Sequence, residues 1–95
     1  MRIRYIPIRS DKIINYTFRQ DIIIVELSGI TDTFDFSKFM EGHAEVSKIE
    51  TELPINPIAS AKIENGELVI ELVRFIGEDA TYEERFPEWE VINNG

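Results

Sequence analysis

Apolar and polar residues alternate most regularly between residues 58 and 75, on both sides of Asn65-Gly66. Such alternation is typical of a half-buried strand, and a two-residue Asn-Gly loop supplies the positive φ angles of a type I′ turn. Residues 58–75 are therefore predicted to form a β-hairpin. The turn sets its register, with Glu64 facing Glu67, Ile63 facing Leu68, Ala61 facing Ile70 and Ala59 facing Leu72. One face is then apolar, and the other carries Ser60, Lys62 and Glu71.

The first half of the chain also alternates with a period of two. Residues 2–8 are predicted to form a strand in which Pro7 confines the second half to a sheet edge or to an end of the pairing, because proline has no N–H. Residues 13–18 and 22–27 are predicted to form a second hairpin across Arg19-Gln20. Its expected pairs are Tyr16 with Ile23 and Ile14 with Val25, because a slip by one residue would place Glu26 opposite Ile14.

Two further segments are predicted around these hairpins. Ser28-Gly29 turns the chain into a strand at 31–36, with Phe34 and Phe36 on one face and Asp32 and Asp35 near solvent or turn ends. Near the C-terminus, Asp79 can cap a helical turn from Tyr82 to Arg85 that Pro87 ends. Tyr82 and Phe86 lie four residues apart, on one face, and are expected to pin this turn to the sheet with Trp89 nearby.

Residues 37–57 are the hardest part of the chain to interpret. Val46, Ile49 and Leu53 fit a helical spacing, whereas 46–50 would also suit a short edge strand. The two prolines at the end of the segment stop either element. We interpret this segment as irregular with one turn of helix, and the sequence leaves its fold open.

Together these patterns predict one all-β domain spanning residues 1–95, an antiparallel meander of about six strands that forms a small barrel or sandwich with one short helical turn near residues 79–86. A chain of 95 residues is long enough for one core. The predicted core residues are Ile14, Tyr16, Ile23, Val25, Leu27, Phe34, Phe36, Ile63, Leu68, Ile70 and Leu72.

Charge is unevenly distributed along the chain. Residues 1–20 hold five basic side chains and one acid, whereas the remaining 75 residues hold five basic and seventeen acidic side chains, and the net charge is −8. Such a charge repels phosphate, so nucleic acid is not an expected ligand. The simplest interpretation is solubility and attraction between the N-terminal strand and the acidic remainder, and the alternative is a charged docking face. The longest aliphatic run, Ile22–Val25, is far below the roughly 18 residues that span a bilayer, so no membrane association is expected.

Candidate chemical groups do not form a recognisable catalytic motif. There is no cysteine and one histidine, so a thiolate or histidine-rich metal site within one chain is not expected. His43 between Glu41 and Glu45 would share a strand face with them and could bind a metal, but an exposed loop beside Gly42 explains it equally. The acids Glu83, Glu84, Glu88 and Glu90 are typical of a solvated turn rather than of paired catalytic carboxylates. The serines lack a nucleophile elbow. We predict that the protein is not an enzyme, binds no cofactor or metal and has no evident small-molecule substrate.

A family resemblance adds a biological context. The segment Asp32–Ser37 followed by Glu41-Gly42, the Asn65–Leu72 hairpin, and Gly77–Ala80 leading to Glu83–Pro87 resemble a group of small proteins encoded beside tail and tail-fibre genes in phages and prophages. The resemblance covers most of the chain and implies a part or assembly accessory of the tail. It implies no catalytic residue. It also implies a location in the host cytoplasm during expression, and in the virion if the protein stays in the particle.

Two functions follow as hypotheses. The first is a structural or assembly protein that contacts copies of itself or other phage tail proteins, and the second is an acidic regulator or inhibitor that occupies a basic surface of a host protein. The acids are spread over different elements rather than placed in rows, which favours the first. The residues expected at a partner contact are Arg2, Arg4, Tyr5, Tyr82 and Trp89. We also predict a homo-oligomer in which a terminal strand or the 58–75 hairpin pairs across subunits, with Arg2 or Arg4 near acids of a neighbour.

Overall fold

The computed structural model describes residues 1–37, 42–43 and 50–92, and within them the chain forms eight strands and one short helix. In chain order these are β1 (Arg2–Arg9), β2 (Ile14–Arg19), β3 (Ile22–Leu27), β4 (Ile30–Asp35), β5 (Gly42–His43), β6 (Ile58–Glu64), β7 (Glu67–Ile76), α1 (Tyr82–Arg85) and β8 (Glu90–Val91). The helix in the described residues is far too short to cross a lipid bilayer.

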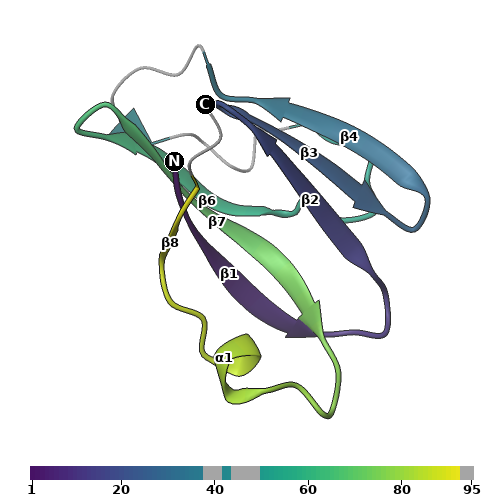
Figure 1. Cartoon of the computed structure of the whole chain (residues 1–95). Coiled ribbons are helices and arrows are strands. Elements are labelled where there is room, and N and C mark those ends of the chain that lie inside the picture. Colours follow the sequence, from purple (N-terminus) through teal and green to yellow (C-terminus); the bar gives the residue numbers. More distant parts are fainter. Residues whose placement is uncertain (38–41, 44–49, 93–95) are drawn as a thin grey trace.

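The strands form two sheets that lie as two layers, with α1 and the C-terminal segment beside β1 (Figure 1). One sheet has the order β5-β6-β7-β1-β8, and the other has the order β2-β3-β4. Apolar side chains from both sheets form one buried cluster, which makes the fold a small sandwich. The predicted all-β class is confirmed, and the described strands do not close into a barrel.

Strand β1 departs from the predicted antiparallel meander, because it pairs with β7 in parallel along its whole length, from Arg2 opposite Val69 to Arg9 opposite Ile76. This register places Ile3 beside Ile70 and Arg4 beside Glu71, so apolar side chains meet in the core and opposite charges meet on the other face. The chain then leaves this sheet after Arg9 and enters the second sheet at Ile14. Local alternation could not predict this pairing, since it brings together residues more than sixty positions apart.

The second hairpin forms with a register shifted by two residues from the prediction. Its loop is Gln20-Asp21, and Phe18 faces Ile23, Tyr16 faces Val25 and Ile14 faces Leu27. A loop at Arg19-Gln20 would have set Phe18 opposite Asp21, whereas the observed register pairs every apolar residue of this face with another. A shift of two keeps each side chain on its predicted face, and Ile23, Val25 and Leu27 are buried as expected.

The 58–75 hairpin and its Asn65-Gly66 turn are confirmed, and both turn residues have positive φ. The expected pair Ala59–Leu72 is wrong, because the register is interrupted between Ile58 and Ser60 and Ile58 faces Leu72. The irregularity places the larger Ile58 in the core and leaves Ala59 exposed. At this point the free energy gained by burying the larger Ile58 side chain therefore outweighs the cost of an interruption in the regular strand pairing.

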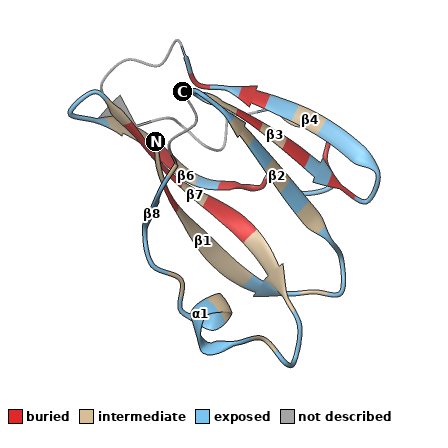
Figure 2. Cartoon of the chain, viewed as in Figure 1, coloured by how far each residue is buried: buried red, intermediate tan, exposed pale blue. Residues whose placement is uncertain are grey.

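Buried residues are most frequent on β3 and β7, while α1 and the C-terminal segment are mostly exposed (Figure 2). Of the predicted core, Ile14, Tyr16 and Ile63 are only partly buried, and the other eight residues are buried. Buried residues that the pattern did not single out are Ile3, Leu53, Pro57, Ile58, Val69 and Val73. Val46 and Ile49 of the helical turn expected within 37–57 lie outside the described residues, and residues 50–57 contain bends and no helix.

The C-terminal helical turn forms, but two details of its prediction are wrong. Thr81, not Asp79, is the N-cap of α1: its hydroxyl accepts a hydrogen bond from the Glu84 N–H, and the Glu84 carboxylate accepts one from the Thr81 N–H. This reciprocal capping box satisfies two donors at once, which a single Asp79 cap would not. Tyr82 and Phe86 do contact each other, with ring centroids 5.0 Å apart, but they remain 73% and 62% exposed and do not pin the turn to the sheet.

Candidate functional site

A groove of about 580 Å³ lies where α1 and the segment after it pass beside the sheet. Three of its lining residues are aromatic, namely Tyr82, Phe86 and Trp89, and four are acids, namely Glu83, Glu84, Glu88 and Glu90. Pro87 and Arg74 complete the lining, and Arg74 is the only one of these residues that comes from β7. Large exposed aromatic side chains around a concavity are typical of a protein contact surface.

Local hydrogen bonds hold the groove wall in shape, although α1 buries none of its own residues. The capping box of Thr81 and Glu84 closes the first turn, and the Arg85 guanidinium donates to the carbonyl oxygens of Glu78 and Ala80. Pro87 then prevents the helix from continuing, and the chain returns to the sheet as β8. The aromatic side chains of the groove are therefore presented by a short but well-bonded segment.

The outer edge of β1 lies next to this region, because Trp89 of the groove contacts Arg4 and Arg74 of the groove contacts Tyr5. Ser10 N–H donates to the Ile76 carbonyl, and Ile92 N–H donates to the Met1 carbonyl. Because backbone groups alternate between the two sides of a strand, even-numbered residues of β1 pair with β7 and odd-numbered residues point outward. Among the described residues, β8 pairs only with Arg2 and Ile3. The outward groups of Tyr5, Pro7 and Arg9 thus lie beyond the end of β8, and Pro7 sits where no ladder N–H is needed, as the sequence predicted for an edge.

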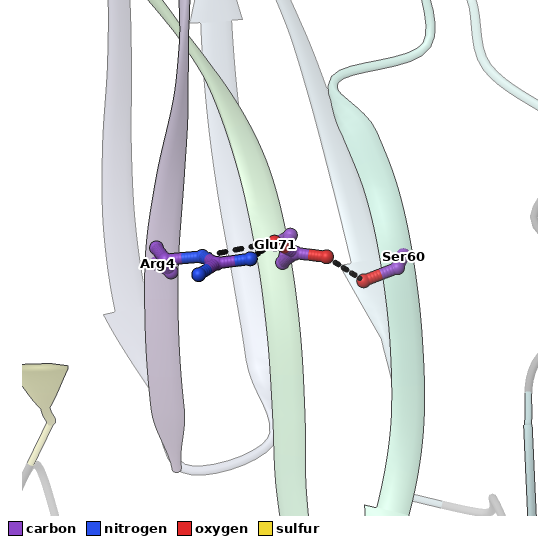
Figure 3. A network of polar contacts seen from close by, with 3 residues as sticks. All are labelled: Arg4, Ser60 and Glu71. Atoms are coloured by element: carbon purple, nitrogen blue, oxygen red, sulfur yellow. Dashed lines mark hydrogen bonds and ion pairs between the residues drawn. The ribbon is translucent and has the colours of Figure 1, made fainter. Parts of the chain in front are cut away.

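Two cations of β1 are held by acids of β7 and by the groove tryptophan. Arg4 donates from Nε and an Nη to one carboxylate oxygen of Glu71, at 3.0 and 2.5 Å, and Ser60 on β6 donates to the other oxygen at 2.8 Å (Figure 3). Arg2 forms an ion pair with Glu67 at 3.1 Å. The guanidinium carbons of Arg4 and Arg2 lie 4.9 and 5.9 Å from the centre of the Trp89 ring. These contacts attach the groove wall to the sheet by cation–π attraction.

The carboxyl group of Glu71 is the electrostatic centre of this network. Its pKa lies below the ordinary value because Arg4 donates hydrogen bonds to it, and the Ser60 hydroxyl adds to the effect. The shared carboxylate joins β1, β7 and β6 on one face of the sheet. The arrangement therefore fixes β1 against the neighbouring strands of its sheet.

A second, smaller concavity of about 340 Å³ adjoins the groove and shares Arg74 and Glu90 with it. Tyr5, Ile14, Asn15 and Tyr16 complete its lining. The Arg74 guanidinium stacks on the Tyr5 ring at 5.0 Å, and the Tyr16 hydroxyl donates to the Val73 carbonyl. Burial raises the pKa of both tyrosine hydroxyls, and the negative charge of Glu90 adds to the effect on Tyr5. Both hydroxyls therefore stay protonated at neutral pH.

The structure brings most of the predicted contact residues together. Arg2, Arg4 and Trp89 form one cluster, Tyr82 lines the same groove as Trp89, and Tyr5 lines the adjoining concavity. Sequence reasoning missed Arg74, because only the parallel pairing of β7 with β1 carries it to this side of the molecule. It also missed that Arg2 and Arg4 find acidic partners within the same chain.

One acid of the groove, Glu84, is used in the cap of α1. The pKa of Glu84 is lowered by hydrogen bonds from the N–H and hydroxyl of Thr81, which opposes a role as a proton donor at neutral pH. Within the described ranges, no three histidine, cysteine or acidic side chains are placed to hold a metal ion. His43 lies on β5 opposite Lys62, and Glu41 and Glu45 of the hypothetical metal site lie outside the described residues.

No protein-family profile matches this chain, and no match was found among curated proteins or among solved structures.

Proposed function

We propose that this protein is a structural or assembly protein that acts through protein–protein contacts, with the groove beside β1 as its docking surface. The observation that carries the proposal is the cluster of exposed Tyr82, Phe86 and Trp89 around a groove of about 580 Å³. Tyrosine and tryptophan contribute disproportionately to binding energy at interfaces, because they bury a large area with little loss of conformational entropy.

The setting that we propose is the tail region of a phage or prophage, where the partner is another tail protein or a second copy of this chain. The support is the resemblance of the Asp32–Ser37, Asn65–Leu72 and Glu83–Pro87 segments to small proteins encoded beside tail genes. A small sheet with an available edge suits such a role, since assembly proteins commonly join through strand edges and exposed aromatic residues.

The alternative function, an acidic regulator that imitates nucleic-acid charge, receives less support from the acids themselves. Such a mimic needs free carboxylates in ordered rows. Glu71 is bonded to Arg4 and Ser60, Asp32 accepts hydrogen bonds from Thr51 and Glu52, and Glu84 is used in a helix cap. These carboxylates stabilise the fold rather than form a continuous surface row.

Co-expression with the products of the flanking genes tests the proposal. We expect a tail component to co-purify with the tagged chain and to be lost with the double variant Tyr82→Ser/Phe86→Ser, because removal of two interface aromatics weakens binding by about tenfold or more. The matched control is Ile13→Ser/Ile30→Ser, which changes two exposed apolar residues, 72% and 41% exposed, elsewhere on the surface. Equal retention by both double variants would contradict the groove as the docking surface, and capture of a host regulator in place of a tail component would favour the alternative.

A further inference from the structure

We infer that the partner contributes an extended, basic segment that adds as a strand to the outer edge of β1 from Tyr5 to Arg9. This inference rests on the proposed function and specifies the chemistry of the partner. The edge is suited to it because the outward backbone groups of Tyr5, Pro7 and Arg9 lie beyond the end of β8, and β8 already pairs with β1 in this manner at Arg2 and Ile3.

The chain's own C-terminal segment cannot extend that pairing. Continued in the register of β8, the next outward residue, Tyr5, would face Glu88. Beyond that pair, Pro7 and Arg9 would face Phe86 and Glu84, but these residues are the C-cap of α1 and part of α1, so the segment cannot run along this part of β1 as a strand. The groove is lined by residues of this departing segment and by Arg74, which stacks on Tyr5, so a strand added at Tyr5 would lie next to the groove.

The charge of the lining points to a basic segment. Four acids line the groove against one cation, Arg74. A positively charged strand would place its side chains near Glu83, Glu88 and Glu90 and beside the faces of Tyr82 and Trp89, where both ion pairing and cation–π attraction favour cations.

A second copy of this chain fits the same place less well. Each copy carries a net charge of −8, and the cations of its basic N-terminal strand are already used within the subunit. Arg2 pairs with Glu67, Arg4 with Glu71 and Arg9 with Glu78. A basic segment of a different protein therefore complements the groove better than the chain's own edge strand does.

The experiment uses the full chain and a short synthetic peptide that alternates lysine and valine, with a peptide that alternates glutamate and valine as the control. Valine favours the extended conformation in both peptides, so the two peptides differ only in the sign of their charge. Trp89 is the only tryptophan and lines the groove, so its fluorescence reports occupancy. Amide hydrogen exchange reports strand pairing. We expect the lysine peptide alone to bind and to slow exchange at Tyr5 and Arg9 by at least about tenfold. Exchange at Thr31, on β4 of the other sheet, should not change.

A pair of charge-matched variants tests the role of the acids. Glu83→Gln/Glu88→Gln should weaken binding of the lysine peptide by about threefold to tenfold, as expected for the loss of two exposed ion pairs, whereas Glu26→Gln/Glu52→Gln should leave it unchanged. Equal binding of both peptides, or none, would overturn the inference. A Trp89 response without slower exchange at Tyr5 would overturn strand addition. In each of these cases the proposed function would still stand if a tail component co-purifies with the chain. If no tail component co-purifies, both the inference and the proposed function are contradicted.

Discussion

Replacement of Glu71 by glutamine tests the bonded network that orders the edge region. Glutamine keeps the shape and size of the side chain and removes its charge. Arg4 would still find one amide oxygen as an acceptor, and the Ser60 hydroxyl would still find a polar partner, so the variant isolates the contribution of the charge. We expect Glu71→Gln to fold and to be less stable than the original chain at pH 7.

The size of the expected loss in unfolding free energy follows from the solvent exposure of the Arg4 and Glu71 side chains. Hydrogen bonds to charged groups contribute about 1.5–3 kcal/mol and neutral ones about 0.5–1.5 kcal/mol. The Arg4 and Glu71 side chains are 40% and 20% exposed, so solvent screening reduces the difference. We therefore expect a loss of about 1 kcal/mol in the free energy of unfolding. A double-mutant cycle with Arg4→Gln should assign most of that loss to the coupling between the two side chains.

Urea unfolding as a function of pH provides the assay. The pKa of Glu71 is lower in the folded state than its ordinary value of 4.5, so the stability that its charge contributes is present above this value and is lost as the pH falls through the folded-state pKa. The stability difference between the original chain and Glu71→Gln should therefore be constant near neutral pH and should shrink below pH 4.5.

The matched control is Glu26→Gln, which removes the same charge from an exposed position on β3. It should change the free energy of unfolding by less than about 0.5 kcal/mol. If Glu71→Gln is as stable as this control at pH 7, or if its deficit does not shrink in acid, the charge of Glu71 does not stabilise the three strands.

Three other predictions concern the turn, the contact between the sheets and self-association. Gly66→Val should lower stability by about 1 kcal/mol or more, seen as a lower melting temperature, because Gly66 has φ +76° and the open space around it leaves backbone strain as the cause. Tyr16→Phe should cost about 1 kcal/mol in urea unfolding by leaving the Val73 carbonyl without its donor, and it should reduce the loss of stability that a raised tyrosine pKa causes above pH 10. Because Arg2 and Arg4 are paired within the chain, the homo-oligomer predicted from the sequence should be held by strand pairing and should persist in high salt in sedimentation experiments, and a monomer at both low and high salt would contradict it. Weaker association in salt would indicate ion pairs between the copies instead.

Local sequence patterns predicted most strands and turns of this fold. They did not predict the pairings that depend on residues far apart in the chain or on several apolar pairs together. The Asn65-Gly66 and Ser28-Gly29 turns and the buried faces of β3 and β4 depend on neighbouring residues, and all of them form as predicted. The parallel pairing of β1 with β7 joins residues more than sixty positions apart in the sequence, so no local alternation can predict it. The shifted loop at Gln20-Asp21 depends on the sum of several apolar pairs rather than on the turn residues alone.

The candidate site could be predicted only in part, for the same reason. The sequence predicts Arg2, Arg4 and Trp89 as contact residues because they are charged or aromatic and lie near the chain ends, and the fold does bring them together. Their position beside Glu71 and Arg74 follows from the order of strands in the sheet. The expectation that Tyr82 and Phe86 pin α1 to the sheet is wrong because their spacing is equally typical of a buried and of an exposed helical face.

The docking surface depends most directly on an available outer edge of β1, and amide hydrogen exchange of the free chain measures it residue by residue. The alternation of backbone groups predicts slow exchange at Arg4, Ile6 and Ile8, whose N–H groups face β7, and fast exchange at Tyr5 and Arg9, whose N–H groups face outward. Equal protection of Tyr5 and its neighbours would mean that this edge is already occupied, and it would contradict the proposal that a partner strand binds there.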